Sequence, residues 1–396
     1  MNIVILLGYN MMNIFEVMQK QISKCYVKGN NWNYSKHKDI YLHFSDECCY
    51  EVELKECAQL SYIKNVDSII LLPTLWGRCD KSEILEAIQR GIEQCIKFNS
   101  VLMVSIQSNY NHREDIIDSV QKLLNENEVY DKLILFLTDV RSKAYSINQT
   151  VLLARRINCS AVGWMDDDVI LSDDAFLHLY EDLRRREFIG SSGALKYPTP
   201  KKYPTSKFLN FAKNKMSTKK TKYPHGCCMM VGVSSIKNLI PARYICDDGF
   251  FFFELLDMKL ENPQNNMRIV EESICQHYVG GNVKDTYFRI RRSIISTVVY
   301  CADYPLDKCL YYLKEVQFNG LFPAMFINVS IKDNIIKSVF KFIFLIWHVV
   351  ILIELFIRRF SGNPLREIAW SAYSWEKTKS LKEKNLYLIN KIVLSN

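Results

Sequence analysis

The stretch AVGWMDDD, residues 161–168, gives the clearest indication of the fold. Five uncharged residues lead directly into three consecutive aspartates. A short uncharged run of this kind is typical of a strand that is buried on both faces of a sheet. In open α/β sheets, ligands bind beyond the carboxyl ends of the strands. The stretch therefore predicts a buried strand with a polar site at its end.

Three similar apolar runs precede this stretch, and each is followed by a helical pattern. The predicted strands are residues 68–72, 101–106 and 133–137, and the predicted helices are about 82–96, 114–125 and 144–156. This alternation indicates a sheet with helices on its faces. The strand ends that would line the same site are Pro73-Thr74, Gln107-Ser108-Asn109 and Asp139.

Composition is that of a folded chain, with 48% apolar and 24% charged residues among 396. This length suffices for one large domain with appendages or for two domains. The formal net charge is +8, and nine lysines with no acid lie between Lys196 and Lys222. Such a stretch suits either an anionic partner, such as a phosphorylated lipid or a membrane surface, or a solvated loop.

Thirteen cysteines occur without Cys-x-x-Cys spacing, and their number is odd. This pattern favours free thiols in a reducing cytoplasm over a disulfide framework or a zinc site. The start of the chain lacks a basic segment before its apolar run, so we expect a buried strand near 2–8 and not a signal peptide. A helix near 12–23 and a strand near 40–44 are expected to follow.

The triple aspartate could bind a divalent metal ion. Clustered carboxylates repel one another, so they need a cation or full exposure to water. Oxygen ligands at Asp166 and Asp168 suit Mg²⁺ or Mn²⁺ while leaving coordination positions for phosphate oxygens. An ordinary solvated acidic turn is the alternative.

Two further motifs carry chemistry. Asp247-Asp248 precedes the aromatic run of residues 250–253, and a carboxylate beside so much apolar surface suits a general base. The alternative is the start of a helix. His277 ends a short strand-like stretch before Gly280-Gly281, where it could be a metal ligand or a packed core residue.

Residues 339–357 are nearly all apolar, but Lys341, His348 and Glu354 interrupt them. A spanning helix needs about 20 apolar residues. We therefore expect an interfacial or partly inserted helix, with a span or a buried core helix as alternatives.

The order of these motifs resembles that of the family 2 glycosyltransferases of the GT-A fold. The likeness covers about residues 66–295. Its motifs are residues 69–78 with Pro73, Thr74 and Arg78, residues 143–148 beginning with Lys143, the Asp-x-Asp of 166–168, His225-Gly226, Cys246-Asp247-Asp248, His277 with its glycines, and Arg289-Ile290-Arg291-Arg292. The form of the triple aspartate and the C-terminal helices are also similar to bacterial rhamnosyl- and galactofuranosyltransferases.

The resemblance implies an α/β GT-A fold, a mixed sheet flanked by helices, and an inverting transfer of a sugar. Asp166, Asp168 and His277 would hold Mn²⁺ or Mg²⁺. The donor would contact Pro73, Thr74, Arg78, Gln107, Asn109, Lys143, Asp166 and Asp167. His225, Gly226, Arg289, Arg291 and Arg292 would contact the acceptor or phosphate, and Asp248 would be the catalytic base, with Asp247 beside it. The arginines could equally border a membrane-facing helix.

The sequence departs from the family pattern in three places. No acid follows the second strand, where the family contacts uracil, so Gln107 or Asn109 would contact the base. Asp247 stands in place of the usual Glu, and Ser142 in place of Gly. The resemblance implies a UDP-sugar as the donor, with a dTDP-sugar as the alternative.

Three regions are expected: an N-terminal α/β extension (1–65), a GT-A domain (66–295) and a C-terminal helical, membrane-associated region (296–396). The expected partners are a glycan or polyprenyl-diphosphate-linked acceptor and the inner membrane surface, but no nucleic acid. The protein would be cytoplasmic and peripheral or monotopic at the inner face of the cell membrane, in surface polysaccharide synthesis of the bacterial type. A sugar nucleotidyltransferase and a non-catalytic lipid-binding protein are the rival interpretations.

Overall fold

The computed structural model describes residues 32–45, 48–77, 80–107, 112–198, 223–277 and 283–318, and scattered positions between 346 and 357. The strand expected near 2–8, the helix expected near 12–23 and most of the lysine-rich stretch lie outside the described residues.

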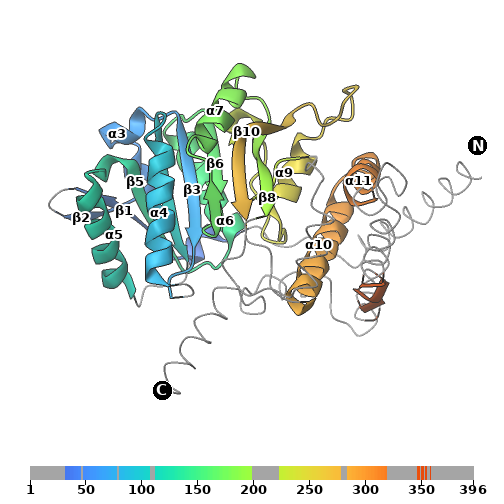
Figure 1. The fold of residues 1–396 in the computed structure, drawn as a ribbon, viewed down its shortest axis with the longest axis horizontal. Helices are drawn as coiled ribbons and strands as arrows, with labels where there is room; N and C mark the ends of the chain where they lie inside the picture. The colour runs from blue at the N-terminus through green and yellow to red at the C-terminus, as the bar shows by residue number, and fades with distance from the viewer. Residues whose placement is uncertain are drawn as a thin grey trace, which may run out of the picture.

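A ten-stranded mixed sheet forms the centre of the fold, in the order β2-β1-β5-β4-β3-β6-β9-β8-β10-β7 (Figure 1). The strands β5, β4, β3 and β6 are parallel neighbours, so their carboxyl ends share one edge. The bounds are β1 (Asp39–Phe44), β2 (Cys49–Val52), β3 (Ser68–Thr74), β4 (Ser100–Gln107), β5 (Leu133–Thr138), β6 (Ala161–Met165), β7 (Val169–Leu171), β8 (Ser191–Pro198), β9 (Cys228–Gly232) and β10 (Met267–His277).

Helices cover both faces of the sheet, which is why the central strands are apolar at successive positions. On one face, α4 (Lys81–Cys95), α5 (Arg113–Asn127) and α7 (Ala175–Arg185) form one apolar core. On the other face, α6 (Lys143–Arg156), α9 (Asp247–Leu255) and α10 (Val283–Asp303) form a second core. The short elements are η1 (Tyr34–Lys36), α2 (Leu54–Cys57), α3 (Ser61–Lys64), η3 (Tyr130–Lys132), η4 (Val233–Ser235), α11 (Leu306–Tyr312) and the π-helical η5 (Leu313–Phe318).

Described residues of the N-terminal extension continue the main sheet. Strand β1 pairs antiparallel with β5, and β2 pairs with β1. Side chains near them bind α6: Tyr34 stacks on Tyr145 with ring centroids 5.4 Å apart, and the Tyr145 hydroxyl donates to Asp39 Oδ2 at 2.6 Å. The predicted strand near 40–44 is therefore confirmed as β1.

A C-terminal segment packs against α10. It is helical at the described positions between 346 and 357. Arg291 of α10 donates Nη2–H to Glu354 Oε1 at 2.8 Å and Nε–H to Oε2 at 3.1 Å, and Trp347 meets Tyr287 edge-on at 6.1 Å. Ile351 is fully buried. Within the described residues, no helix combines the length and the apolar character needed to cross a bilayer.

The predicted fold class is confirmed at its coarser level: a large mixed sheet lies between layers of helices (Figure 1). The strands and helices predicted between 68 and 165 match β3 to β6 within two residues at each end. The alternative interpretation of Asp247-Asp248 is a helix start in which one of the two caps residues 250–260. The structure has a helix there, α9, which begins at Asp247 and ends at Leu255. The domain boundaries at 65 and 295 stay predictions; α10 runs across the second.

Candidate active site at the carboxyl edge of the sheet

The candidate site begins where the parallel strands end. Strand β3 ends at Thr74, β4 at Gln107 and β6 at Met165, and the triple aspartate follows β6. The Thr74 hydroxyl donates to Asp167 Oδ2 at 2.8 Å, which ties two of these strand ends together. Gln107 is buried, and its side-chain Nε2–H donates to Ser146 Oγ on α6 at 3.3 Å.

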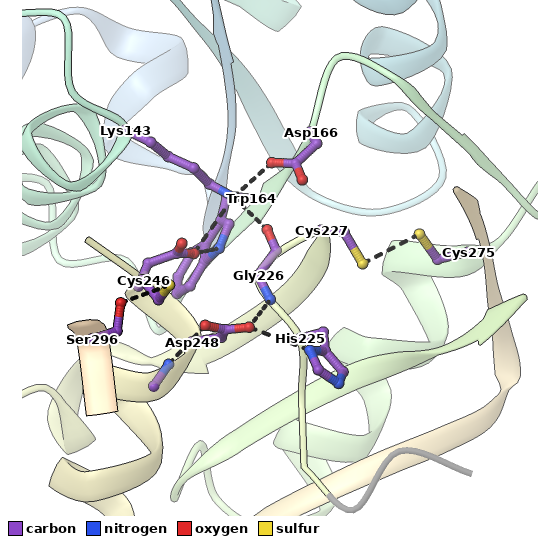
Figure 2. A network of polar contacts seen from close by, with 12 residues as sticks. Lys143, Trp164, Asp166, His225, Gly226, Cys227, Cys246, Asp248, Cys275 and Ser296 are labelled. Carbon is purple, nitrogen blue, oxygen red and sulfur yellow. Dashed lines mark hydrogen bonds and ion pairs between the residues drawn. The ribbon is translucent and has the colours of Figure 1, made fainter. Parts of the chain in front are cut away.

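Lys143 joins three chain segments that are distant in sequence (Figure 2). It is the first residue of α6, after the N-cap Ser142, whose hydroxyl accepts from the Tyr145 N–H. Lys143 Nζ donates to Asp166 Oδ1 at 2.6 Å and to the Gly226 carbonyl, and it lies 3.5 Å from Asp247 Oδ2. Burial by itself lowers the pKa of Lys143, but the two carboxylates outweigh it and hold the pKa above its ordinary value. Lys143 is therefore a buried cation between two acidic motifs.

Asp247 is held on its other side by the indole of Trp164. Trp164 Nε1–H donates to Asp247 Oδ2 at 2.7 Å. Burial raises the pKa of Asp247 to about 6, against the lowering effect of Lys143 and with further raising by Asp248 and Asp166. Its carboxylate anchors β6, α6 and the start of α9 to one another.

Asp248 has a different environment although it is the next residue. Its Oδ2 lies 3.3 Å from His225 Nδ1 and accepts a long hydrogen bond of 3.5 Å from the Gly226 N–H, and its Oδ1 accepts from the Gly249 N–H at 2.8 Å. Burial alone would raise the pKa of Asp248, but these donors, His225 first, bring it below its ordinary value. The Asp248 side chain is 21% exposed and that of Asp247 is 12% exposed, so Asp248 is the more accessible of the pair.

Gly226 has no room for a side chain. An added Cβ would lie 2.4 Å from Asp247 Oδ2 and 2.9 Å from its Cγ. The backbone of Gly226 also accepts from Lys143 and donates to Asp248. A glycine at this position lets the backbone of one residue approach all three charged groups.

A cluster of buried aromatic side chains follows the acidic pair in α9. Phe250, Phe251, Phe252 and Phe253 are buried, and Phe251 packs on Trp164 with ring centroids 5.1 Å apart. The cluster therefore adjoins Asp247 through Trp164, and burial of the Asp247 carboxylate is the first cause of its raised pKa.

His277 lies beside the triple aspartate. In the antiparallel pairing of β10 with β7, His277 is opposite Val169, the residue after Asp168. His277 Nδ1 lies 2.9 Å from the Tyr197 carbonyl. A carbonyl can only accept, so Nδ1 carries the proton and Nε2 carries the lone pair that a metal ion would need.

The donor set suits a hard divalent cation that is completed by substrate. Among the described residues, no three His, Cys, Asp or Glu side chains are arranged to hold a metal ion by themselves. Magnesium-type sites are commonly built from one or two protein ligands together with the substrate's phosphate oxygens. Asp168 and His277 fit that description, because Asp168 directly precedes Val169, which pairs with His277 in the sheet.

The structure gives contacts for two of the predicted arginines. Arg291 binds Glu354 of the C-terminal segment. Arg292 lies near Cys246, the residue before Asp247, and its charge opposes the burial that raises the pKa of Cys246. Arg289 belongs to α10. Arg78, Asn109 and Gly280-Gly281 lie outside the described residues.

Two features of the site were not predicted as such from the sequence. Trp164 was seen only as part of a strand, although its alternation with Met165 places it on the face that α9 covers. Cys227 follows Gly226, and its Sγ lies 3.8 Å from that of Cys275 on β10 (Figure 2). No spacing in the sequence indicates this pair, because 48 residues separate the two thiols.

No protein-family profile matches the sequence, and no curated protein matches it. Among solved structures, a mannosyltransferase from Pyrobaculum calidifontis in complex with GDP-Man and Mn²⁺ is similar at 13% identity and a TM-score of 0.45, over 82% of this chain and 96% of that chain. Glucosyl-3-phosphoglycerate synthase from Mycobacterium tuberculosis, in complex with Mn²⁺, UDP and phosphoglyceric acid, matches at 10% identity and a TM-score of 0.39, over 64% and 84%. Likenesses at this level do not determine the reaction of this chain.

Proposed function

We propose that the protein is a metal-dependent inverting glycosyltransferase that moves a sugar from a nucleoside diphosphate onto a hydroxyl. One observation carries the proposal: Lys143, the triple aspartate and the Asp247-Asp248 pair meet at the carboxyl edge of the sheet. In the β10–β7 ladder, His277 pairs with Val169, the residue that follows the triple aspartate. The site therefore has a cation-binding part, at the triple aspartate and His277, beside a proton-accepting part at the Asp247-Asp248 pair. This arrangement suits an in-line displacement in which a diphosphate is the leaving group.

Asp168 and His277 would hold Mn²⁺ or Mg²⁺, with Asp166 supporting them. When bound, the ion would neutralise the charge of the departing diphosphate. Lys143 fixes Asp166 in position through its 2.6 Å contact. Because Lys143 is neutralised by two carboxylates, its first role is to organise the site and not to bind phosphate.

The acceptor would bind in the part of the site that contains Asp248. A hydroxyl that attacks the anomeric carbon must lose its proton, and a general base contributes about 10²–10⁴-fold to such a step. Asp248 is more accessible than Asp247, which is engaged by both Trp164 and Lys143. Asp248→Asn is therefore expected to reduce turnover more than Asp247→Asn.

The donor is proposed to be a UDP-sugar, with a dTDP-sugar as the alternative. Gln107 ends β4 at the site edge and offers an amide where an acid would be expected. The acceptor is proposed to be a glycan or a polyprenyl-diphosphate-linked sugar, in surface polysaccharide synthesis; this part rests on the motif resemblance.

An assay of products separates this proposal from its rivals. The purified protein is incubated with Mn²⁺ and a panel of nucleotide sugars, and the nucleoside diphosphate that is released is measured by mass spectrometry. A transferase releases nucleoside diphosphate, slowly even to water. A nucleotidyltransferase instead forms a nucleotide sugar and pyrophosphate from a nucleoside triphosphate and a sugar phosphate. A non-catalytic lipid-binding protein does neither, which would contradict the proposal.

Membrane association is proposed from the C-terminal segment. Its outward positions are apolar and 45–60% exposed: Ile346, Val349, Val350, Ile353 and Ile357. They recur at helical spacing, opposite the face that packs on α10, and Lys337, Lys341, Arg358 and Arg359 flank them in the sequence. Such a face suits an anionic bilayer surface. Vesicles with anionic lipid should sediment the protein, and Ile353→Asp should release it; binding that high salt abolishes would exclude an inserted apolar face.

A further inference from the structure

His225 and Asp248 form a pair that the roles above do not explain. His225 precedes Gly226 in the segment before β9, and its Nδ1 lies 3.3 Å from Asp248 Oδ2 (Figure 2). The ring packs against Tyr223, with ring centroids 4.9 Å apart. Both side chains are partly accessible, at 28% for His225 and 21% for Asp248.

Both carboxylate oxygens of Asp248 already accept hydrogen bonds. One oxygen receives His225 and the Gly226 N–H, and the other receives the Gly249 N–H. Hydrogen bonds to the charged form of a carboxylate stabilise that form and weaken it as a base.

His225 has the complementary property. An ionised carboxylate can only accept, so the hydrogen on Nδ1 must belong to the imidazole, and the lone pair lies on Nε2. Figure 2 shows this second nitrogen on the side of the ring away from Asp248. Within the part of the chain that the structure describes, the polar contact of the His225 ring is the one with Asp248.

We propose that Nε2 of His225 takes the proton of the acceptor hydroxyl, while Asp248 holds the ring and stabilises the imidazolium that forms. This inference rests on the proposed glycosyl transfer and reassigns the proton-accepting role from the Asp248 carboxylate to the imidazole of His225. The acceptor oxygen forms a bond to the anomeric carbon as the bond from that carbon to the diphosphate oxygen breaks. The diphosphate leaves with the electron pair, and the acceptor proton moves to Nε2.

Charged and titratable groups around the ring are few among the described residues. Asp248 on α9 faces Nδ1, and the Tyr223 ring covers one side of the imidazole. Lys143 acts at longer range, through its effect on Asp248. Protonation of His225 before the reaction would remove the lone pair, so turnover should fall on the acid side of the pH profile.

Two variants separate proton transfer from positioning. His225→Asn keeps an N–H donor for Asp248 but has no proton acceptor, and His225→Ala leaves space for added imidazole. We expect kcat of His225→Asn to fall by about 10²–10⁴-fold and its acid limb to disappear. Imidazole should partly restore kcat of His225→Ala. Donor binding, followed by thermal shift, should stay at the wild-type level in both. Wild-type kcat and an unchanged acid limb in His225→Asn would overturn the inference.

A measurement that does not depend on turnover tests the same assignment. Nitrogen-15 NMR of the imidazoles, with His225→Asn to identify the signal, should show the Nδ1–H tautomer for His225. The Nε2–H tautomer would overturn the inference even if sugar transfer proceeds. A wild-type protein that releases no nucleoside diphosphate from any donor would instead contradict the proposed function itself and this inference with it.

Discussion

Replacing Lys143 with Met tests the electrostatic centre of the site. The side chain of Lys143 is 15% exposed, and its Nζ lies 2.6 Å from Asp166 and 3.5 Å from Asp247. Removing one member of a buried ion pair typically costs about 3–5 kcal/mol, because the partner is left charged and unpaired. We expect a loss of about 3 kcal/mol in the free energy of unfolding at pH 7.5, since Asp166 can be solvated in part.

The loss should depend on pH and on Asp247. At pH 5, Asp247 can take up a proton for little cost because its pKa is already raised to about 6, so Lys143→Met should be less destabilising there. The double variant with Asp247→Asn should recover part of the loss, because neutral replacement of a buried pair is often tolerated.

Lys81→Met is the matched control. Lys81 Nζ lies at the same 2.6 Å from Asp115 Oδ1, but both side chains are about half exposed. Exposed pairs contribute about 0–1 kcal/mol, so this variant should stay close to wild type. Urea unfolding followed by tryptophan fluorescence measures all four proteins. Equal, small losses in Lys143→Met and Lys81→Met would refute Lys143 as a buried counter-charge.

Three further predictions follow from the same contacts. Gly226→Ala should lower the free energy of unfolding by about 1–3 kcal/mol and abolish turnover, since the new Cβ would lie 2.4 Å from Asp247 Oδ2. Gly91→Ala meets only the flexible end of Leu102, at 2.7 Å, and should leave turnover unchanged; equal behaviour of both variants would contradict this. The pKa of Asp247 is raised from 3.8 to about 6 in the folded protein. The protonated carboxyl therefore makes its full contribution to the free energy of unfolding below pH 3.8, and this contribution is lost as the pH rises through about 6. Asp247→Asn should therefore gain stability relative to wild type by up to about 3 kcal/mol across this window, in urea unfolding at stepped pH; a constant difference would refute it. Asp168→Ala should abolish nucleoside diphosphate release without moving the urea midpoint, and retained release would remove Asp168 from the site.

The central sheet was predictable because its strands are buried on both faces. A strand in that position must be apolar at successive residues, as in 68–74, 100–107 and 133–138, and the helices between them keep their own period. The polar edge was predictable for a related reason, since parallel strands place their ends together. The register of β1 on β5 was not, because pairing between segments that are distant in sequence leaves no local pattern.

Within the site, the sequence indicated which residues carry charge but not which residues they contact. Asp247 and Asp248 are adjacent and identical in type, yet one binds Trp164 and Lys143 and the other binds His225. Both residues lie in the first turn of α9, and their side chains differ in direction only because the helix rotates from one residue to the next. For Arg291 the sequence left two interpretations open, a phosphate contact and the border of a membrane-facing helix, and neither indicated its partner Glu354, which lies 63 residues further on.

Calorimetric titration of nucleoside diphosphates, with and without Mn²⁺, tests the central claim most directly because it needs no knowledge of the acceptor. The account predicts that a nucleoside diphosphate binds to the wild-type protein only when Mn²⁺ is present, and that Asp168→Ala and His277→Ala each abolish this binding. Asp248→Asn should bind as tightly as wild type, because it changes the acceptor side alone. Binding that is equally strong without the metal, or that survives both Asp168→Ala and His277→Ala, would contradict the assignment of a metal-dependent donor site to this edge of the sheet.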